Sequence, residues 1–211
     1  MSLFLRRRGV VASSKRDFVV SSEVANAIRN GAGNTVSFSV GTGFTNGNGF
    51  SVTDGWALTL DRTAGNGLQL WRVVGGVRTG PIDGVSDFTT MGQFYDLGFA
   101  FEDNGHLTGS GDLVILLDGV EVMREANDFT LTSSSVVGFD SRVGSSNGSR
   151  VRFRNVTFGT VVYDDAATDQ RSANWNVLVG ALTHSASPPF YDLTVNPTAN
   201  AHVQSTGTVL P

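Results

Sequence analysis

The chain has 211 residues, of which 40% are hydrophobic and 26 are glycines, and its formal net charge is −4. This composition suits one domain with extensions, or one domain and a small second one. The absence of cysteine excludes disulfides, thiolate metal sites and cysteine nucleophiles, and no apolar run approaches the roughly 20 residues of a membrane-spanning helix. Charged residues make up only 16%, which is typical of a surface covered by neighbours in an assembly and equally of a single domain with a neutral polar surface.

The first 34 residues are predicted to form a basic arm with one short helix. Residues 1–30 carry a balance of +4, whereas the rest of the chain carries −8. Ser22 offers a helix N-cap before Glu23, and Asn30 and Gly31 offer a stop. The segment is too short to be stable alone, so we expect it to dock on the body of the protein or on a partner.

Three arginines near the start of the chain are candidates for partner binding: Arg6, Arg7 and Arg8. Basic arms on acidic proteins often contact an acidic partner, and arginine makes planar, bidentate contacts suited to interfaces. The alternative is a solvated tail. No apolar segment follows these arginines, so no secretory signal is expected.

Residues 35–163 are predicted to form an antiparallel β-sandwich, because apolar and polar residues alternate along many short segments separated by Gly, Asn and Asp. The strongest hairpin signal is Asp118-Gly119, and Gly75-Gly76 is a second one. Residues 80–92 are predicted to be a loop, and residues 94–101 a strand buried on both faces. Further strands are expected over residues 36–40, 56–60, 68–71, 113–117, 120–123, 129–132, 149–158 and 161–163.

Residues 164–211 are predicted to be a C-terminal extension. A polar stretch follows Tyr163, and the one good strand candidate is Tyr191–Val195. We expect this extension to pair with the sandwich or with a neighbouring subunit.

The segment of residues 112–158 also carries a resemblance. Its apolar strand, the turn Leu117-Asp-Gly-Val120 and the late strand Arg152-Phe-Arg-Asn-Val-Thr-Phe158 resemble the concanavalin A-like lectin and laminin G-like jelly rolls over about residues 35–160. The resemblance implies an all-β, antiparallel jelly-roll sandwich. Carbohydrate binding is the commonest role in that superfamily.

Such a role uses an exposed aromatic ring to stack on a sugar, together with polar groups that bond its hydroxyls. Trp71 and Gln69 alternate with Leu68 and Leu70, so they should point outward if the leucines point into the core. Trp56 shares the phase of Leu58 and Leu60 and is predicted to lie in the core. The carbohydrate-binding candidates are therefore Trp71, Gln69, Asn46 and Asn48. The alternative is that Trp71 is covered by a terminal extension.

Catalysis is not expected. A glucanase of this superfamily needs paired carboxylates on one strand, as in E-x-D-x-x-E, and the chain has no such run. It also lacks a G-x-S-x-G motif, and we predict that His106, in a turn, is an exposed surface residue. No cofactor is predicted. Calcium is the one metal for which the sequence offers candidate ligands, because residues with oxygen-bearing side chains cluster near two turns. Asp and Asn are also ordinary turn residues, which is the alternative explanation. The candidates are Glu102, Asp103, Asn104 and Asp112 at one turn, and Asp83 and Asp87 at the other.

Arg150, Arg152 and Arg154 alternate with apolar residues, which predicts three arginines on one strand face. The apolar phase then changes, which predicts a β-bulge near Asn155. The arginines could contact an acidic neighbour, an anionic polysaccharide, or carboxylates of the same sheet. Nucleic acid is not expected as a partner, because the body is acidic and no aromatic–basic RNA motif is present.

These patterns together predict a non-enzymatic structural or interaction protein. The expected setting is a virion, as a phage decoration, head-fibre or tail-associated subunit made in the host cytoplasm, since lectin-like jelly rolls recur in such proteins. Expected partners are other virion subunits and copies of the chain itself, with a host surface glycan as a further candidate and no membrane. A free carbohydrate-binding module is the alternative, and a glycan-cleaving enzyme is disfavoured by the missing carboxylate pair.

Overall fold

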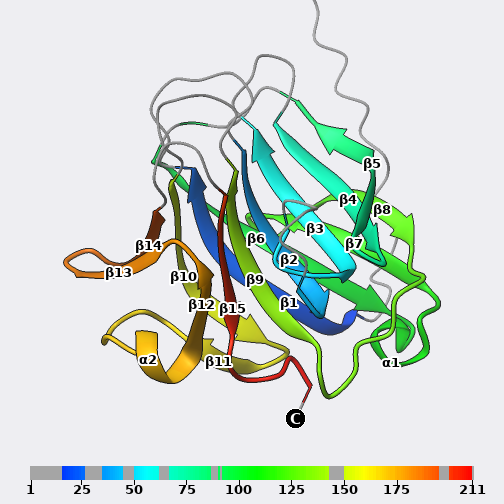
Figure 1. Cartoon of the computed structure of the whole chain (residues 1–211). Coiled ribbons are helices and arrows are strands. Elements are labelled where there is room, and N and C mark those ends of the chain that lie inside the picture. Colours follow the sequence, from blue (N-terminus) through cyan, green and yellow to red (C-terminus); the bar gives the residue numbers. More distant parts are fainter. Residues whose placement is uncertain are drawn as a thin grey trace, which may run out of the picture.

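The computed structural model describes residues 16–26, 35–44, 50–61, 67–86, 90, 92–142, 150–194 and 200–210. The described strands form two antiparallel sheets that face each other, with two short helices beside them (Figure 1). The predicted all-β sandwich is therefore confirmed, whereas its jelly-roll connectivity stays a prediction. Within the described ranges, no helix combines the length and apolar character needed to cross a membrane.

Sheet A has the order β13-β14-β10-β1-β6-β7-β8, and β11 also pairs with β10. Its strands are β1 (Arg16–Asn26), β6 (Phe94–Glu102), β7 (Asp112–Leu117), β8 (Val120–Ala126), β10 (Arg150–Phe158), β11 (Val161–Asp164), β13 (Ala181–Ala186) and β14 (Pro189–Thr194).

Sheet B has the order β12-β15-β9-β2-β3-β4-β5. Its strands are β2 (Thr35–Thr42), β3 (Asp54–Asp61), β4 (Leu68–Val74), β5 (Val77–Val85), β9 (Val136–Arg142), β12 (Trp175–Val179) and β15 (Ala201–Ser205), and the helices are α1 (Gly105–Thr108) and α2 (Arg171–Asn174).

The core lies between the two sheets and is built from the inward-facing residue of each alternating pair. Phe139 of β9 stacks on Phe153 of β10 with ring centroids 3.9 Å apart, which joins the sheets directly. Trp56 is 2% exposed and belongs to this core, as predicted. Because side chains alternate along a strand, the opposite face of each strand is left for the outer surface of the sandwich.

Both predicted hairpins are present. Asp118 and Gly119 connect β7 to β8 with φ values of 51° and 76°, the pair of positive values that a two-residue turn of this kind requires. Gly75 and Gly76 connect β4 to β5 in the same way, with φ values of 56° and 77°.

The helix predicted between Glu23 and Arg29 is wrong over the described residues. Residues 16–26 form strand β1, which lies inside sheet A between β6 and β10. Val20 and Val24 face the core, so the segment follows the two-residue period of a strand. Pairing on both sides supplies hydrogen bonds that outweigh the weak helix preference of Glu23 and Ala25. This part of the predicted arm therefore belongs to the sandwich.

Three further local predictions differ from the structure. Residues 129–132 are not a strand, although Phe129 and Leu131 are buried. The successive strands of residues 112–158 would be expected to form one half of the sandwich, but β9 lies in sheet B whereas β7, β8 and β10 lie in sheet A. The predicted loop from residue 80 is strand β5 as far as Val85, a sheet edge that tolerates Pro81 because one side needs no hydrogen bond.

The C-terminal residues are part of both sheets. Strands β12 and β15 complete one side of sheet B, and β13 and β14 complete one side of sheet A. Strand β14 includes the predicted Tyr191 segment, and it pairs with β13 on one side and with β10 on the other. The predicted pairing with the sandwich is thus confirmed, but the region contributes four strands where the sequence predicted one.

Candidate functional site

Strand β10 places three arginines on the outer face of sheet A, as predicted. Arg150 donates from Nε and Nη2 to the two carboxylate oxygens of Asp192, at 3.1 and 2.6 Å. Arg152 donates from Nε to the same carboxylate at 3.2 Å. The Asp192 side chain is only 5% exposed, so two guanidinium groups compensate its charge. The predicted carboxylates of the same sheet are therefore confirmed as partners of the arginines.

The third arginine is held from the other side of the strand. Arg154 contacts Glu23 of β1 through Nε at 2.8 Å and Nη2 at 2.7 Å, and the Asn155 amide donates to the same carboxylate. In the register of β1 with β10, the single residue Ser22 lies opposite two residues, Asn155 and Val156. Asn155 has a φ of 53°. The bulge predicted near Asn155 is confirmed, and it brings the amide and the guanidinium to one carboxylate.

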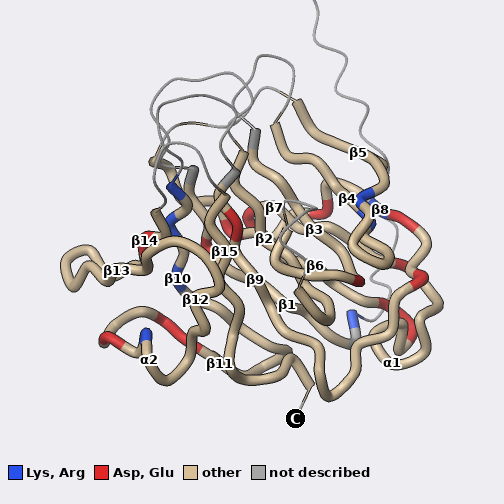
Figure 2. Tube along the Cα trace, viewed as in Figure 1, with Lys and Arg blue, Asp and Glu red and all other residues tan. Residues whose placement is uncertain are grey.

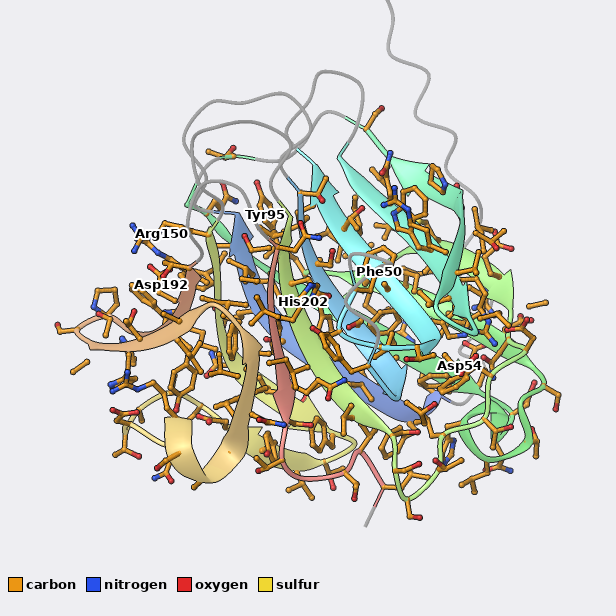
Figure 3. All side chains as sticks on the ribbon, in the orientation of Figure 1. Phe50, Asp54, Tyr95, Arg150, Asp192 and His202 are labelled. Carbon is orange, nitrogen blue, oxygen red and sulfur yellow. The ribbon has the colours of Figure 1, made fainter. Side chains whose placement is uncertain are left out.

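Two phenylalanines that the sequence did not single out complete this surface. Arg152 lies over the ring of Phe190, 4.8 Å from its centroid, and Arg154 lies over Phe94 at 4.4 Å. The two rings are 6.1 Å apart and half-buried. We call these residues the arginine–phenylalanine surface: Arg150, Arg152, Arg154, Phe94, Phe190, Asp192 and Glu23. Figure 3 shows its Arg150 and Asp192 side by side.

Ion pairing leaves part of this surface free to bind. Among the contacts of the described residues, Arg152 uses only Nε for hydrogen bonding, so its two Nη groups keep their N–H donors. The guanidinium groups of Arg152 and Arg154 are each oriented by a phenyl ring beneath them, which reduces the entropy lost when a ligand binds. Planar guanidinium donors match carboxylates in a bidentate geometry.

Trp71 points outward from sheet B, as its phase predicted, but its surroundings are crowded. Its Nε1 donates to Thr59 at 3.0 Å, Arg78 lies over the ring at 5.1 Å, and Phe50 packs at 6.2 Å. Among the described residues, the side chains that contact the ring therefore include Phe50 and Arg78, which lie within the predicted sandwich. Gln69, half-buried on the same face, lies opposite Thr59 in the register.

Six of the predicted site residues and ligands cannot be placed. Asn46, Asn48, Arg6, Arg7, Arg8 and Asp87 lie outside the described residues.

The oxygen-rich turn considered for calcium is organised around an arginine. Arg124 Nη1 contacts Glu102 at 2.6 Å and Asp112 at 2.7 Å, and its Nε contacts Glu121 at 3.0 Å. These hydrogen bonds raise the pKa of Arg124 further above its usual range. The described residues contain no cluster of three or more metal-ligating side chains.

A buried polar cluster lies on the outer face of sheet B, beneath the segment that contains Phe50 (Figure 3). Asp140 Oδ1 accepts hydrogen bonds from the hydroxyl of Ser51 and, at 2.6 Å, from Nδ1 of His202. All three side chains are buried, and burial raises the pKa of Asp140. Asp140 Oδ2 and His202 Nε2 have no hydrogen-bond partner among the described residues.

This cluster is not a serine relay of the hydrolase kind. Ser51 donates to the carboxylate and not to the imidazole, so His202 is not placed to take its proton. The prediction that His106 is a surface residue is wrong: its ring is 8% exposed and stacks on Phe18 at 4.8 Å. The signal for His202 was its alternation with the apolar residues Ala201 and Val203, which marks a strand.

Comparison of the chain with models of known protein families and with curated proteins gives no match. Function is therefore inferred from the chemistry of its surfaces.

Proposed function

We propose that the protein is a non-enzymatic interaction protein that acts as a structural subunit of a larger assembly, such as a phage virion in which it decorates the capsid or belongs to a head fibre or the tail. The sandwich docks through the arginine–phenylalanine surface. The observation that carries this proposal is the stacking of Arg152 and Arg154 on Phe190 and Phe94 across four strands of one sheet face.

The chemistry of this surface is that of a protein interface. Arginine and aromatic residues are enriched where binding energy concentrates, and the strongest contributors are those held in place before binding. A partner that brings a carboxylate to Arg152 would accept hydrogen bonds from its unused Nη groups and cover the rings of Phe94 and Phe190. The low overall charge fits a protein whose surface is partly covered by neighbours.

The test is the mass of the purified protein in solution, measured by sedimentation velocity across the micromolar range. The full-length chain is compared with a variant that lacks residues 1–15, which removes Arg6, Arg7 and Arg8 but keeps β1. We expect a defined oligomer heavier than the 22.3 kDa chain. Retention of the oligomer in the shortened variant assigns assembly to the sandwich, and its loss assigns assembly to the basic segment. A monomer at every concentration contradicts self-assembly.

Carbohydrate binding is the second candidate, favoured by the Phe94–Phe190 pair beside charged hydrogen-bonding groups. The test is a glycan array probed with the wild type, with Phe94→Ala and with Trp71→Ala. Loss of a glycan signal in Phe94→Ala alone places the sugar on sheet A, and loss in Trp71→Ala alone places it on sheet B. No signal from folded wild type contradicts this candidate.

A further inference from the structure

The outer face of sheet A is divided into an acidic half and a basic half. Five carboxylates and two arginines lie on or beside β6, β7 and β8: Asp96, Glu102, Asp112, Asp118, Glu121, Arg16 and Arg124. Three arginines and two carboxylates lie across β1, β10 and β14: Arg150, Arg152, Arg154, Glu23 and Asp192. In Figure 2 the acidic residues of β8 and the basic residues of β10 lie on opposite sides of the molecule.

The acidic half is short of positive charge within the described chain. Arg124 is shared by three carboxylates, and Arg16 of β1 lies opposite Glu102 in the register. Nearby Glu23 and Asp118, after burial, raise the pKa of Asp96, which shows that negative charges act on one another here. Residues 102–128 contain seven acidic side chains and one basic one. A partner with guanidinium groups would relieve this repulsion.

The basic half, in turn, has arginine side chains that can bind carboxylates of a partner. Arg150 is 47% exposed, and Arg152 keeps both Nη groups available for an incoming carboxylate. A small, largely buried apolar cluster lies on the same face within the acidic half and next to β1: Ala100, Val114, Leu116 and the partly buried Val19. Unlike charge in the two halves of one face suits a two-fold interface, because each half of one copy then meets the other half of its partner.

We propose that two copies of this chain associate through the outer faces of their A sheets, related by a two-fold axis near β1 and β6. This inference rests on the proposed function and names the partner of that same surface. The arginines of β10 in each copy contact the carboxylates around β7 and β8 in the other. The seven strands of the described sheet path span roughly 600 Å² in projection, and a standard interface covers about 800 Å² of accessible surface per partner.

Edge-to-edge pairing is the competing way to join such sandwiches, and the charges disfavour it. Strand β8 is one edge of sheet A, and it carries the exposed, charged side chains of Glu121 and Arg124. Charged side chains on edge strands oppose such pairing. Face-to-face association instead brings unlike charges together.

The experiment exchanges charge between the two halves. Arg150→Glu and Glu121→Arg are made separately, and their masses are measured by sedimentation velocity alone and as an equimolar mixture. In a two-fold dimer each variant repels its own copies at two places, so each alone is expected to be monomeric. In the mixed pair both contacts join unlike charges, so the mixture is expected to recover a dimer of twice the 22.3 kDa chain mass.

Controls separate folding from assembly. Arg78→Glu makes the same change on sheet B and should leave the dimer intact. Arg150→Gln and Glu121→Gln remove the charge without reversing it, and they serve if a reversed charge prevents folding. Each should weaken the dimer and reduce its sensitivity to salt, because one charged contact fewer remains to be screened.

The outcomes also separate this inference from the proposed function. A wild-type oligomer that both reversals leave unchanged overturns the face-to-face arrangement while assembly itself stands. Rescue that produces species growing with concentration, and not a dimer, overturns the two-fold axis in favour of head-to-tail contacts. A monomeric wild type overturns both.

Discussion

Replacing Asp164 with alanine is expected to lower the free energy of unfolding by about 4 kcal/mol, because several buried donors lose their acceptor together. The carboxylate is 4% exposed and accepts hydrogen bonds from the Trp175 indole at 2.8 Å, the Asn174 amide at 3.1 Å and the Tyr191 hydroxyl at 3.2 Å. The backbone N–H of Ala166 donates to it as well, at 2.8 Å. One side chain thus ties β11, β12 and β14 together across both sheets.

The matched control is the adjacent Asp165. Its exposed carboxylate accepts only the Ala167 N–H, at 2.8 Å, so Asp165→Ala should cost less than about 1 kcal/mol. The measurement is urea unfolding followed by tryptophan fluorescence, because Trp175 reports directly on the site. Equal losses in the two variants would contradict the view that residues 164–210 are integral to the sandwich.

The C-terminal strands are integral to both sheets, and they show where local sequence patterns no longer predict the structure. The two-residue alternation of core strands such as β3 and β7 was enough to predict them, and Asp118-Gly119 predicted its turn, because both signals are local. Strand β12 has no comparable signal: its anchor is the hydrogen bond between Trp175 and Asp164, and it lies in sheet B whereas β11 lies in sheet A. No pattern within either segment reveals that contact.

The interaction surface was predictable only in part, for the same reason. The alternation of Arg150, Arg152 and Arg154 predicted their shared face and the need for carboxylates. Phe94 and Phe190 could not be assigned to it, because they come from β6 and β14, which are brought together by a sheet order that the sequence does not encode locally. Phe94 begins a strand that was predicted to be buried on both faces, and Phe190 precedes the strand predicted from Tyr191, so the sequence assigned neither ring to an outer surface.

The buried cluster of Ser51, Asp140 and His202 gives the second large effect, which depends on pH. Burial raises the pKa of Asp140, with His202 and Ser51 opposing that shift. The folded state therefore binds more protons than the unfolded state between about pH 4, the usual aspartate value, and the higher folded pKa. This contribution to stability is complete below about pH 4 and is lost as the pH rises through the folded pKa.

Asp140→Asn is expected to abolish this part of the pH dependence while keeping the geometry. The amide oxygen can accept from Ser51 and His202, and no buried charge forms. Asp140→Ala should instead cost about 2–4 kcal/mol, since the Ser51 hydroxyl and the His202 N–H would remain buried without an acceptor.

The measurement is the urea midpoint of the wild type and both variants from pH 4 to pH 8, compared as differences at each pH. Asp96, whose pKa is also raised, and the arginine-paired carboxylates are common to all three proteins, so their contributions cancel in the difference. We expect the stability of the wild type relative to Asp140→Asn to fall as the pH rises. A constant difference would mean that Asp140 has the same charge at every pH tested.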